Sequence, residues 1–380
     1  MNEAKRRVLL GASGFGLVSG LSACSMFGSS KAKLAELPNL AANRLGVVWR
    51  TSVDGAGFGF QPAYAADSIW LAGKDGGISR LDARSGKPQW SIKASTPLIA
   101  GVGADGDIAV VASRDGRLLA FDGQGKSKWV HALGTEASSV PTVAVGVVVV
   151  RTSDNKTIGI DSESGRRRWT FGRQNAPVVI RQTASVAIDG GSTFVGLPGG
   201  RLVSLSLQNG SVRWEAPVSN PRGSTEIERI ADVLGSPLIS GRDICAATYQ
   251  GRVSCFEVAT GRPLWSREWS AVGGVELDGR NAYASDSRGF VVGLSRGDRG
   301  APIWTQEMLK GRELTAPVLV GSTLMVGDQS GLIHALSATD GNLIGRLPTD
   351  GSPIVSAGLN AGGLAVFQTT AGGVYAVSAT

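Results

Sequence analysis

Tryptophan recurs along this chain at an interval of about forty residues. Successive spacings are 41, 39, 40, 45, 51 and 39 residues, for Trp49, Trp90, Trp129, Trp169, Trp214, Trp265 and Trp304. A fixed period of this length is the sequence mark of a repeat architecture, in which each unit stacks on its neighbours to bury a shared core. The period therefore constrains the fold of the whole chain.

Each repeat carries the same order of turn and strand signals. Residues 75–90 show it well: Asp75-Gly76 suits a hairpin turn, a short apolar strand follows, a second turn ends at Gly86, and the next strand carries Trp90. The pattern starts eight times along the chain. In the next repeat we expect four strands, over residues 97–102, 107–112, 117–121 and 128–132.

The first and last repeats complete each other. Trp49 has no preceding strands of its own, and the last unit, which starts at Ala371, stops at Thr380 before a fourth strand. We predict an all-β, eight-bladed β-propeller over residues 45–380, with four antiparallel strands per blade and an N-terminal strand closing the last blade. Closure removes the exposed sheet edges of an open ring. The 54 glycines among 380 residues suit so many tight turns.

The N-terminus has the pattern of an export signal. Lys5-Arg6-Arg7 precedes an apolar stretch, Val8–Leu21, that is too short for a membrane span. Leu21-Ser22-Ala23-Cys24 resembles the lipobox of bacterial lipoprotein precursors, which implies lipidation of Cys24. We therefore predict a lipoprotein signal peptide over residues 1–23, and a lipid anchor with a flexible linker over 24–44. A plain signal peptide with a chance cysteine is the alternative, and the two arginines also suit a twin-arginine signal.

The charge of the chain argues against nucleic acid as a partner. The net charge is +7, and beyond the N-terminal signal the longest basic run is Arg166-Arg167-Arg168. A nucleic-acid surface needs a clustered basic stripe with interleaved aromatics, and we find none in the sequence.

Two further cysteines, Cys245 and Cys255, lie symmetrically about the turn at residues 249–251. In a hairpin they would face one another on neighbouring strands, and an oxidising compartment allows a disulfide there. The alternative is a pair of buried, reduced thiols, which a core tolerates well. Either state is structural.

Two repeats are longer than the others, and their extra residues fall in loops. The first loop lies around residues 173–185 and the second spans 219–235, in adjacent repeats. Long loops on a rigid scaffold commonly carry binding, and mixed charge with interspersed Ile, Val and Leu suits a protein contact. Loop decoration without a function is the alternative.

The repeat skeleton resembles the pyrroloquinoline-quinone (PQQ) enzyme-like propeller repeat. The lipobox, the ring size and the stretch from Gly223 to Val233 are together similar to the BamB family, lipoprotein accessories of the outer-membrane β-barrel assembly (BAM) machinery. The resemblance implies a non-catalytic scaffold without cofactor, on the periplasmic face of the outer membrane. It would be lipid-anchored in the inner leaflet, bind the POTRA domains of BamA, and aid insertion of β-barrel proteins. Unfolded outer-membrane proteins are a further candidate partner.

The same resemblance implies which residues contact BamA: Val178, Ile180, Arg181 and Asp232. The sequence departs from the family pattern in two places. Val178 and Ile180 replace leucines, and Leu234 stands where a second acidic residue is common. Arg181 could fork onto a carboxylate of the partner while Asp232 answers a basic group. Alternatively, Arg181 and Asp232 pair with each other and order the two loops.

The competing class is an enzyme, a PQQ-type quinoprotein dehydrogenase. Such enzymes share the repeat but generally carry adjacent cysteines at the cofactor, and this chain has no adjacent cysteines and no Cys-x-x-Cys-His haem motif. Its two histidines, His131 and His334, lie far apart in sequence, and we expect structural roles for both. We predict no catalytic, cofactor-binding or metal-binding residue. A ligand-binding propeller is a third alternative.

Overall fold

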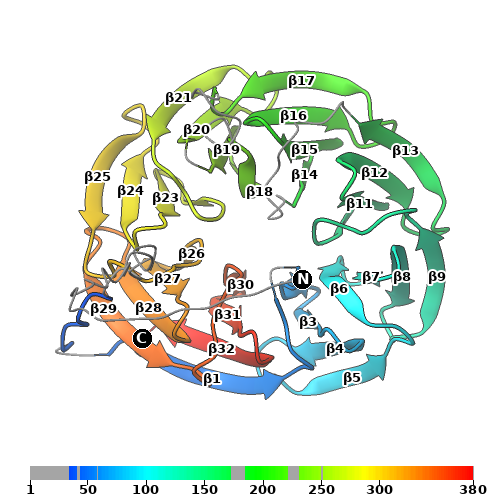
Figure 1. The fold of residues 1–380 in the computed structure, drawn as a ribbon, viewed down its shortest axis with the longest axis horizontal. Coiled ribbons are helices and arrows are strands. Elements are labelled where there is room, and N and C mark those ends of the chain that lie inside the picture. The colour runs from blue at the N-terminus through cyan, green and yellow to red at the C-terminus, as the bar shows by residue number, and fades with distance from the viewer. Residues whose placement is uncertain are drawn as a thin grey trace, which may run out of the picture. The chain divides into compact units, whose positions relative to one another are not determined.

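The computed structural model describes residues 34–40, 43–57, 59–172, 185–220, 231–249 and 251–379. Within these residues, strands form eight four-stranded antiparallel sheets arranged as the blades of one ring (Figure 1). The predicted all-β, eight-bladed propeller is confirmed. No helix in this part of the chain is long and apolar enough to span a membrane.

Each blade starts with a strand near the ring axis and ends with a strand at the rim (Figure 1). The second and third strands carry most of the buried core, whereas the rim strands combine exposed residues with a few buried ones. The first four blades are blade 1, β2 (Ala63–Ala65), β3 (Ser68–Ala72), β4 (Gly77–Asp82) and β5 (Pro88–Lys93); blade 2, β6 (Leu98–Ala104), β7 (Ile108–Ser113), β8 (Arg117–Asp122) and β9 (Ser127–Ala132); blade 3, β10 (Thr142–Ala144), β11 (Val147–Arg151), β12 (Lys156–Asp161) and β13 (Arg167–Gly172); and blade 4, β14 (Ala187–Asp189), β15 (Ser192–Leu197), β16 (Arg201–Ser206) and β17 (Val212–Pro217).

The second half of the ring repeats this plan, and its last blade joins the two ends of the chain. Its blades are blade 5, β18 (Val233–Ser240), β19 (Asp243–Thr248), β20 (Arg252–Glu257) and β21 (Pro263–Glu268); blade 6, β22 (Glu276–Leu277), β23 (Asn281–Ser285), β24 (Val291–Ser295) and β25 (Ala301–Gln306); blade 7, β26 (Val318–Val320), β27 (Thr323–Gly327), β28 (Leu332–Ser337) and β29 (Leu343–Pro348); and blade 8, β30 (Leu359–Ala361), β31 (Leu364–Gln368), β32 (Gly373–Ala379) and β1 (Leu45–Ser52).

The ring closes through the pair β1 and β32. Their register runs antiparallel from Leu45 opposite Ala379 to Ser52 opposite Gly373, with one bulge between Val47 and Trp49. The N-terminal strand therefore supplies the rim strand of the last blade, as the unpaired Trp49 predicts.

The tryptophan period has a direct physical cause at the blade interfaces. Trp169 on β13 covers Gly210, in the turn between β16 and β17 of the next blade, and its Nε1 donates to the Leu207 carbonyl at 2.8 Å. Gly210 has φ +71, and a Cβ there would come within 2.8 Å of the indole ring. The corresponding ring and glycine pairs are Trp49 with Gly86, Trp90 with Gly125, Trp129 with Gly165, Trp214 with Gly261, Trp265 with Gly300, and Trp304 with Gly341.

The one interface without this pair lies between blades 7 and 8. Gly345 occupies the tryptophan position of β29, and blade 8 has no turn to receive a ring because its third and fourth strands are the two ends of the chain. Asn43 and Leu45 fill the space instead, since a Cβ at Gly345 would come within 3.0 Å of each. The Asn43 amide bonds both the N–H and the carbonyl of Arg346, at 3.0 and 2.8 Å.

The described part of the predicted linker lies against the ring. The Ala35 N–H donates to the Lys310 carbonyl at 2.9 Å, and Arg346 donates to the Pro38 carbonyl at 3.3 Å. Leu37, between these two contacts, packs on the apolar cluster that contains Trp304. The ring therefore holds residues 34–40 in place.

We expect the Gly210→Ala variant to lose much more stability than Gly191→Ala. Both positions have positive φ, +71 and +78, which costs an alanine about 1–2 kcal/mol. A Cβ at Gly191 meets nothing within 4 Å, whereas at Gly210 it clashes with Trp169 and adds about 1–3 kcal/mol of overpacking. Urea unfolding measures both losses. Equal shifts in the midpoint would show that contact with the indole ring does not restrict this turn.

Candidate partner-binding face

In every blade, one turn and the connection to the next blade lie at the same face of the ring. Because neighbouring strands are antiparallel, the turn between the second and third strands lies at the same end as the connection that leaves the rim strand. In blade 4, the Val218 N–H of the connection donates to Gly200 in the turn at 2.8 Å. We call the face formed by these turns and connections the connection face.

The two long loops predicted from the sequence both belong to this face. One falls in the connection from β13 to β14, and the other in the connection from β17 to β18, which lead into and out of blade 4. Val178, Ile180 and Arg181 lie outside the described residues, as does Cys24. The ends of both connections, at residues 185–186, 218–220 and 231–232, are described.

Asp232 is the last residue of the second connection, directly before β18, and it is only 6% exposed. Its Oδ1 accepts a hydrogen bond from the Gly199 N–H at 3.0 Å, and its backbone carbonyl accepts one from Tyr249 at 3.0 Å. The carboxylate therefore bridges the turn of blade 4 to the start of blade 5. This buried position is a finding about Asp232 that the sequence did not indicate.

The turn that Asp232 holds is enclosed on both sides. Gly200 has φ +73, and a Cβ there would approach the carbonyls of Ser219 and Ala231 to 2.7 and 2.9 Å. Only glycine fits between the two ends of the connection at this point. Backbone packing against Gly200 therefore fixes the two described ends of the second connection, at Ser219 and Ala231.

Sequence analysis missed a second charged residue on this face. Arg151 is the last residue of β11 in blade 3, and it is only 2% exposed. Burial lowers the pKa of its guanidinium to about 10, and the negative charge of Asp232 opposes that shift. Arg151 therefore stays protonated at neutral pH. The signal that marks it is an arginine that ends an all-valine run, Val147–Val150.

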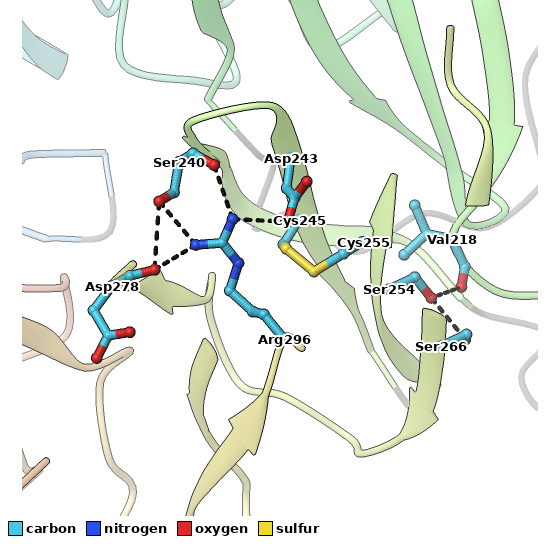
Figure 2. Close-up of a disulfide and its surroundings, with 9 residues drawn as sticks. All are labelled: Val218, Ser240, Asp243, Cys245, Ser254, Cys255, Ser266, Asp278 and Arg296. Atoms are coloured by element: carbon cyan, nitrogen blue, oxygen red, sulfur yellow. Dashed lines mark hydrogen bonds and ion pairs between the residues drawn. A yellow bond between two sulfur atoms is a disulfide. The ribbon is translucent and has the colours of Figure 1, made fainter. Parts of the chain in front are cut away.

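Cys245 and Cys255 lie directly opposite one another on β19 and β20, and the structure joins them in a disulfide (Figure 2). Both are fully buried in the core of blade 5. Nearby, at the face opposite the connection face, Arg296 reaches from blade 6 to Ser240 and Asp243 of blade 5 at 2.8 and 2.7 Å (Figure 2). The disulfide lies within one blade, and Arg296 joins two.

Both histidines make polar contacts within the ring. His131 Nδ1 contacts the Gly165 carbonyl at 2.8 Å, across the interface of blades 2 and 3. His334 is fully buried, with Nε2 2.9 Å from Asp328, which also pairs with Arg312 at 2.8 Å. Among the described residues, no group of three His, Cys, Asp or Glu side chains could hold a metal ion.

Comparison with known proteins decides the family. The family model described as "Outer membrane protein assembly factor BamB" matches residues 74–306 and 288–380. The chain belongs to this family. The outer membrane protein assembly factor BamB of Bordetella pertussis is 41% identical over 341 residues, covering 88% of each chain.

Solved structures agree on the fold. The crystal structure of BamB from Moraxella catarrhalis has a TM-score of 0.81 and 28% identity, and the match covers 88% of this chain and 99% of that one. The quinohemoprotein alcohol dehydrogenase of Comamonas testosteroni has a TM-score of 0.67 at 14% identity, covering 88% of this chain and 76% of that one. The second likeness concerns the fold alone, because propellers with one architecture serve unrelated functions.

We expect the stability of the ring to fall between pH 7 and pH 5 through His334. Burial lowers the pKa of His334, although Asp328 opposes the shift, so the unfolded chain takes up a proton first as the pH falls. The stabilisation is present above the unfolded-state pKa, about 6.5, and declines towards the lower folded-state value. Urea unfolding of the His334→Gln variant should show a smaller decline, with His131→Gln as the matched control. An unchanged pH dependence in His334→Gln would contradict this.

We also expect the disulfide to contribute to stability. The bond links residues 10 apart, and the chain-entropy model gives about 2–3 kcal/mol for a loop of that size. Equilibrium urea unfolding with a reductant should show a lower midpoint than without it. The Cys245→Ala/Cys255→Ala variant should be insensitive to reductant. If the urea midpoint of the wild type is the same with and without reductant, the two cysteines are not joined in a disulfide.

Proposed function

We propose that this chain is a non-catalytic scaffold lipoprotein of the BAM machinery, and that its connection face binds the POTRA domains of BamA. Membership of the BamB family supports the assembly role, since the relatives are named as outer membrane protein assembly factors. The observation that supports the site is the chain topology, because the two long connections lead into and out of blade 4 and antiparallel pairing brings their ends to one face.

The structure of the ring suits a scaffold. Indole rings pack at seven of the eight blade interfaces, and β1 closes the circle, so the connection face is presented on a rigid support. A preorganised surface loses little conformational entropy when a partner docks. Val178 and Ile180 would supply apolar contacts in the centre of such an interface, with Arg181 as a charged anchor. Asp232 is buried and bonded to Gly199, so it would contribute indirectly, by holding the end of the second connection in place.

The lipobox around Cys24 supports a lipid anchor, and Ser25 after the cysteine favours the outer membrane over the inner one. The chain would then work on the periplasmic side of the outer membrane, attached to the inner leaflet. There it would hold BamA while β-barrel proteins fold and insert. This placement agrees with the family name and with a disulfide in an oxidising compartment.

The test is a binding assay between residues 25–380 and a purified soluble POTRA fragment of BamA. We expect the wild type to bind, and the Ile180→Asp and Arg181→Ala variants to lose about tenfold or more in affinity, since central apolar and arginine anchors dominate interface energy. Ile303→Asp is the matched control, because Ile303 is an exposed apolar residue on the rim strand β25. It should bind like the wild type.

The outcomes separate the function from the site. If the wild type fails to bind, the scaffold proposal is wrong. If it binds and the two variants bind equally well, the function stands and the contact residues lie elsewhere. Urea unfolding of each variant checks that lost binding is not lost folding.

A further inference from the structure

One tryptophan on the connection face lies outside the repeat. Of the nine tryptophans, seven cover a turn glycine of the next blade, and Trp70 is fully buried in blade 1. The ninth, Trp269, is partly buried and is the first residue after the rim strand β21 of blade 5. Its Nε1 has no hydrogen-bond partner in the described part of the chain.

The same position in other blades shows what the fold requires there. In six blades, the first residue after the rim strand donates its N–H to the carbonyl of the turn glycine, at 2.8–3.1 Å, and Trp269 bonds Gly251 in this way. The other five residues are all smaller than tryptophan: Val53, Ala94, Leu133, Val218 and Thr349. Since alanine is sufficient at this position in blade 1, the fold does not require an indole ring in blade 5.

Blade 6 also departs from the repeat, at the point nearest to Trp269. In the turn between β23 and β24, Arg288 precedes the glycine. The corresponding residues of the other seven blades are acidic or uncharged: Asp75, Asp115, Asp154, Gly199, Gln250, Ser330 and Ala371. Cζ of Arg288 lies 5.9 Å from the ring centre of Trp269 and 4.5 Å from that of Phe290. Two departures from the repeat therefore meet across the interface of blades 5 and 6.

Arg288 is held in place and is still open to solvent. Its Nε and Nη2 both contact the buried carboxylate of Asp286 at 2.7 Å, and its side chain is 63% exposed. The Arg288 carbonyl accepts a hydrogen bond from the Gly311 N–H at 2.7 Å, which fixes the turn as well. Among the described residues, none bonds Nη1. A guanidinium that is already oriented loses little conformational freedom when it binds a partner.

These two side chains fit one kind of partner group. The planar guanidinium suits a carboxylate, and the ring beside it suits an apolar group on the same partner. Tryptophan and arginine are also enriched among the residues that dominate the energy of protein interfaces. The pair therefore indicates a protein surface that presents an acidic side chain next to an apolar one.

The position of this pair continues the face that we propose for BamA. The carbonyl of Asp232, the last residue of the second long connection, accepts a hydrogen bond from the Tyr249 N–H at 3.0 Å. Trp269 bonds Gly251 in the same turn of blade 5. A stable interface takes about 20–30 residues from each partner, so a protein docked on the second connection extends over the residues beside it.

We propose that Trp269 and Arg288 form a further contact for the POTRA domains of BamA, at the interface of blades 5 and 6, and that they bind an acidic side chain with an apolar neighbour. The proposal rests on the proposed function and extends its interface beyond the two long connections. The interface then runs along the connection face from blade 4 to blade 6.

The test is binding of the soluble POTRA fragment by residues 25–380 carrying Trp269→Val or Arg288→Ser. These changes introduce the residues that blades 4 and 7 carry at the same positions, Val218 and Ser330. We expect Trp269→Val to weaken binding about tenfold or more, as for an aromatic anchor. Arg288→Ser should weaken it about two- to fivefold, as for an exposed ion pair. The second loss should shrink at high salt, whereas the first should persist.

Matched controls come from blade 2, which lies across the ring from blade 6 (Figure 1). Leu133 has the position of Trp269 in that blade, and Arg114 is an exposed arginine in the corresponding turn. Leu133→Val and Arg114→Ser should bind like the wild type, and equal losses in these controls would overturn the proposal. Urea unfolding checks that all four variants are folded. If Trp269→Val is not, Arg288→Ser decides.

Photo-crosslinking distinguishes direct contact from an indirect effect. A benzophenone amino acid in place of Arg288 should crosslink to the POTRA fragment, and the same group in place of Arg114 should not. Loss of binding in Arg288→Ser without this crosslink would overturn the proposal, because the residue would then act through the second connection. A crosslink to a second copy of this chain instead would also overturn it.

The binding results separate this contact from the proposed function. Normal binding by Trp269→Val and Arg288→Ser, alongside loss in Ile180→Asp, would overturn the contact and leave the proposed function intact. Failure of the wild type to bind would overturn both.

Discussion

The stacking of an indole ring on a turn glycine of the next blade is the contact on which the ring depends. It recurs at seven blade interfaces, with the Nε1 of Trp169, for example, bonding across the interface as well. A ring of blades cannot close unless each interface has nearly the same geometry, and a repeated pair of one large and one absent side chain provides that. The eighth interface differs because both chain ends meet there. Asn43 and Leu45 fill the space beside Gly345 in place of an indole ring.

Such regularity explains why the fold could be predicted from the sequence. The spacing of the tryptophans reports the blade period, and the unpaired Trp49 with the truncated last repeat predicts the closing strand β1. The contact of residues 34–40 with blades 6 and 7 could not be predicted, because the segment is short, irregular and held by single hydrogen bonds. The sequence repeat predicts contacts that recur in every blade, whereas the contact of residues 34–40 occurs only once among the described residues.

The candidate site likewise has features that the sequence predicts and features that only the structure shows. Unequal repeat lengths mark both long connections, and antiparallel pairing then places them at one face. Asp232 was singled out through a family resemblance, but its burial beneath the turn at Gly199 depends on contacts between blades. Arg151 lies in a strand, 81 positions before Asp232, and no local pattern relates the two. Residues that act together from different blades become visible only when the ring is assembled.

Two buried arginines at the connection face differ in how their charge is balanced. Arg312 lies against Asp328, whose pKa burial alone would raise but which hydrogen bonds from His334, the Leu332 N–H and Arg312 hold down at about 2. That charge is neutralised within the free protein, so it serves the fold. Arg151 is equally buried at the end of β11, and the negative charge of Asp232, directly before β18, favours its protonated form. The charge of Arg151 in blade 3 is therefore opposed by a residue at the start of blade 5, so this balance exists only in the assembled ring.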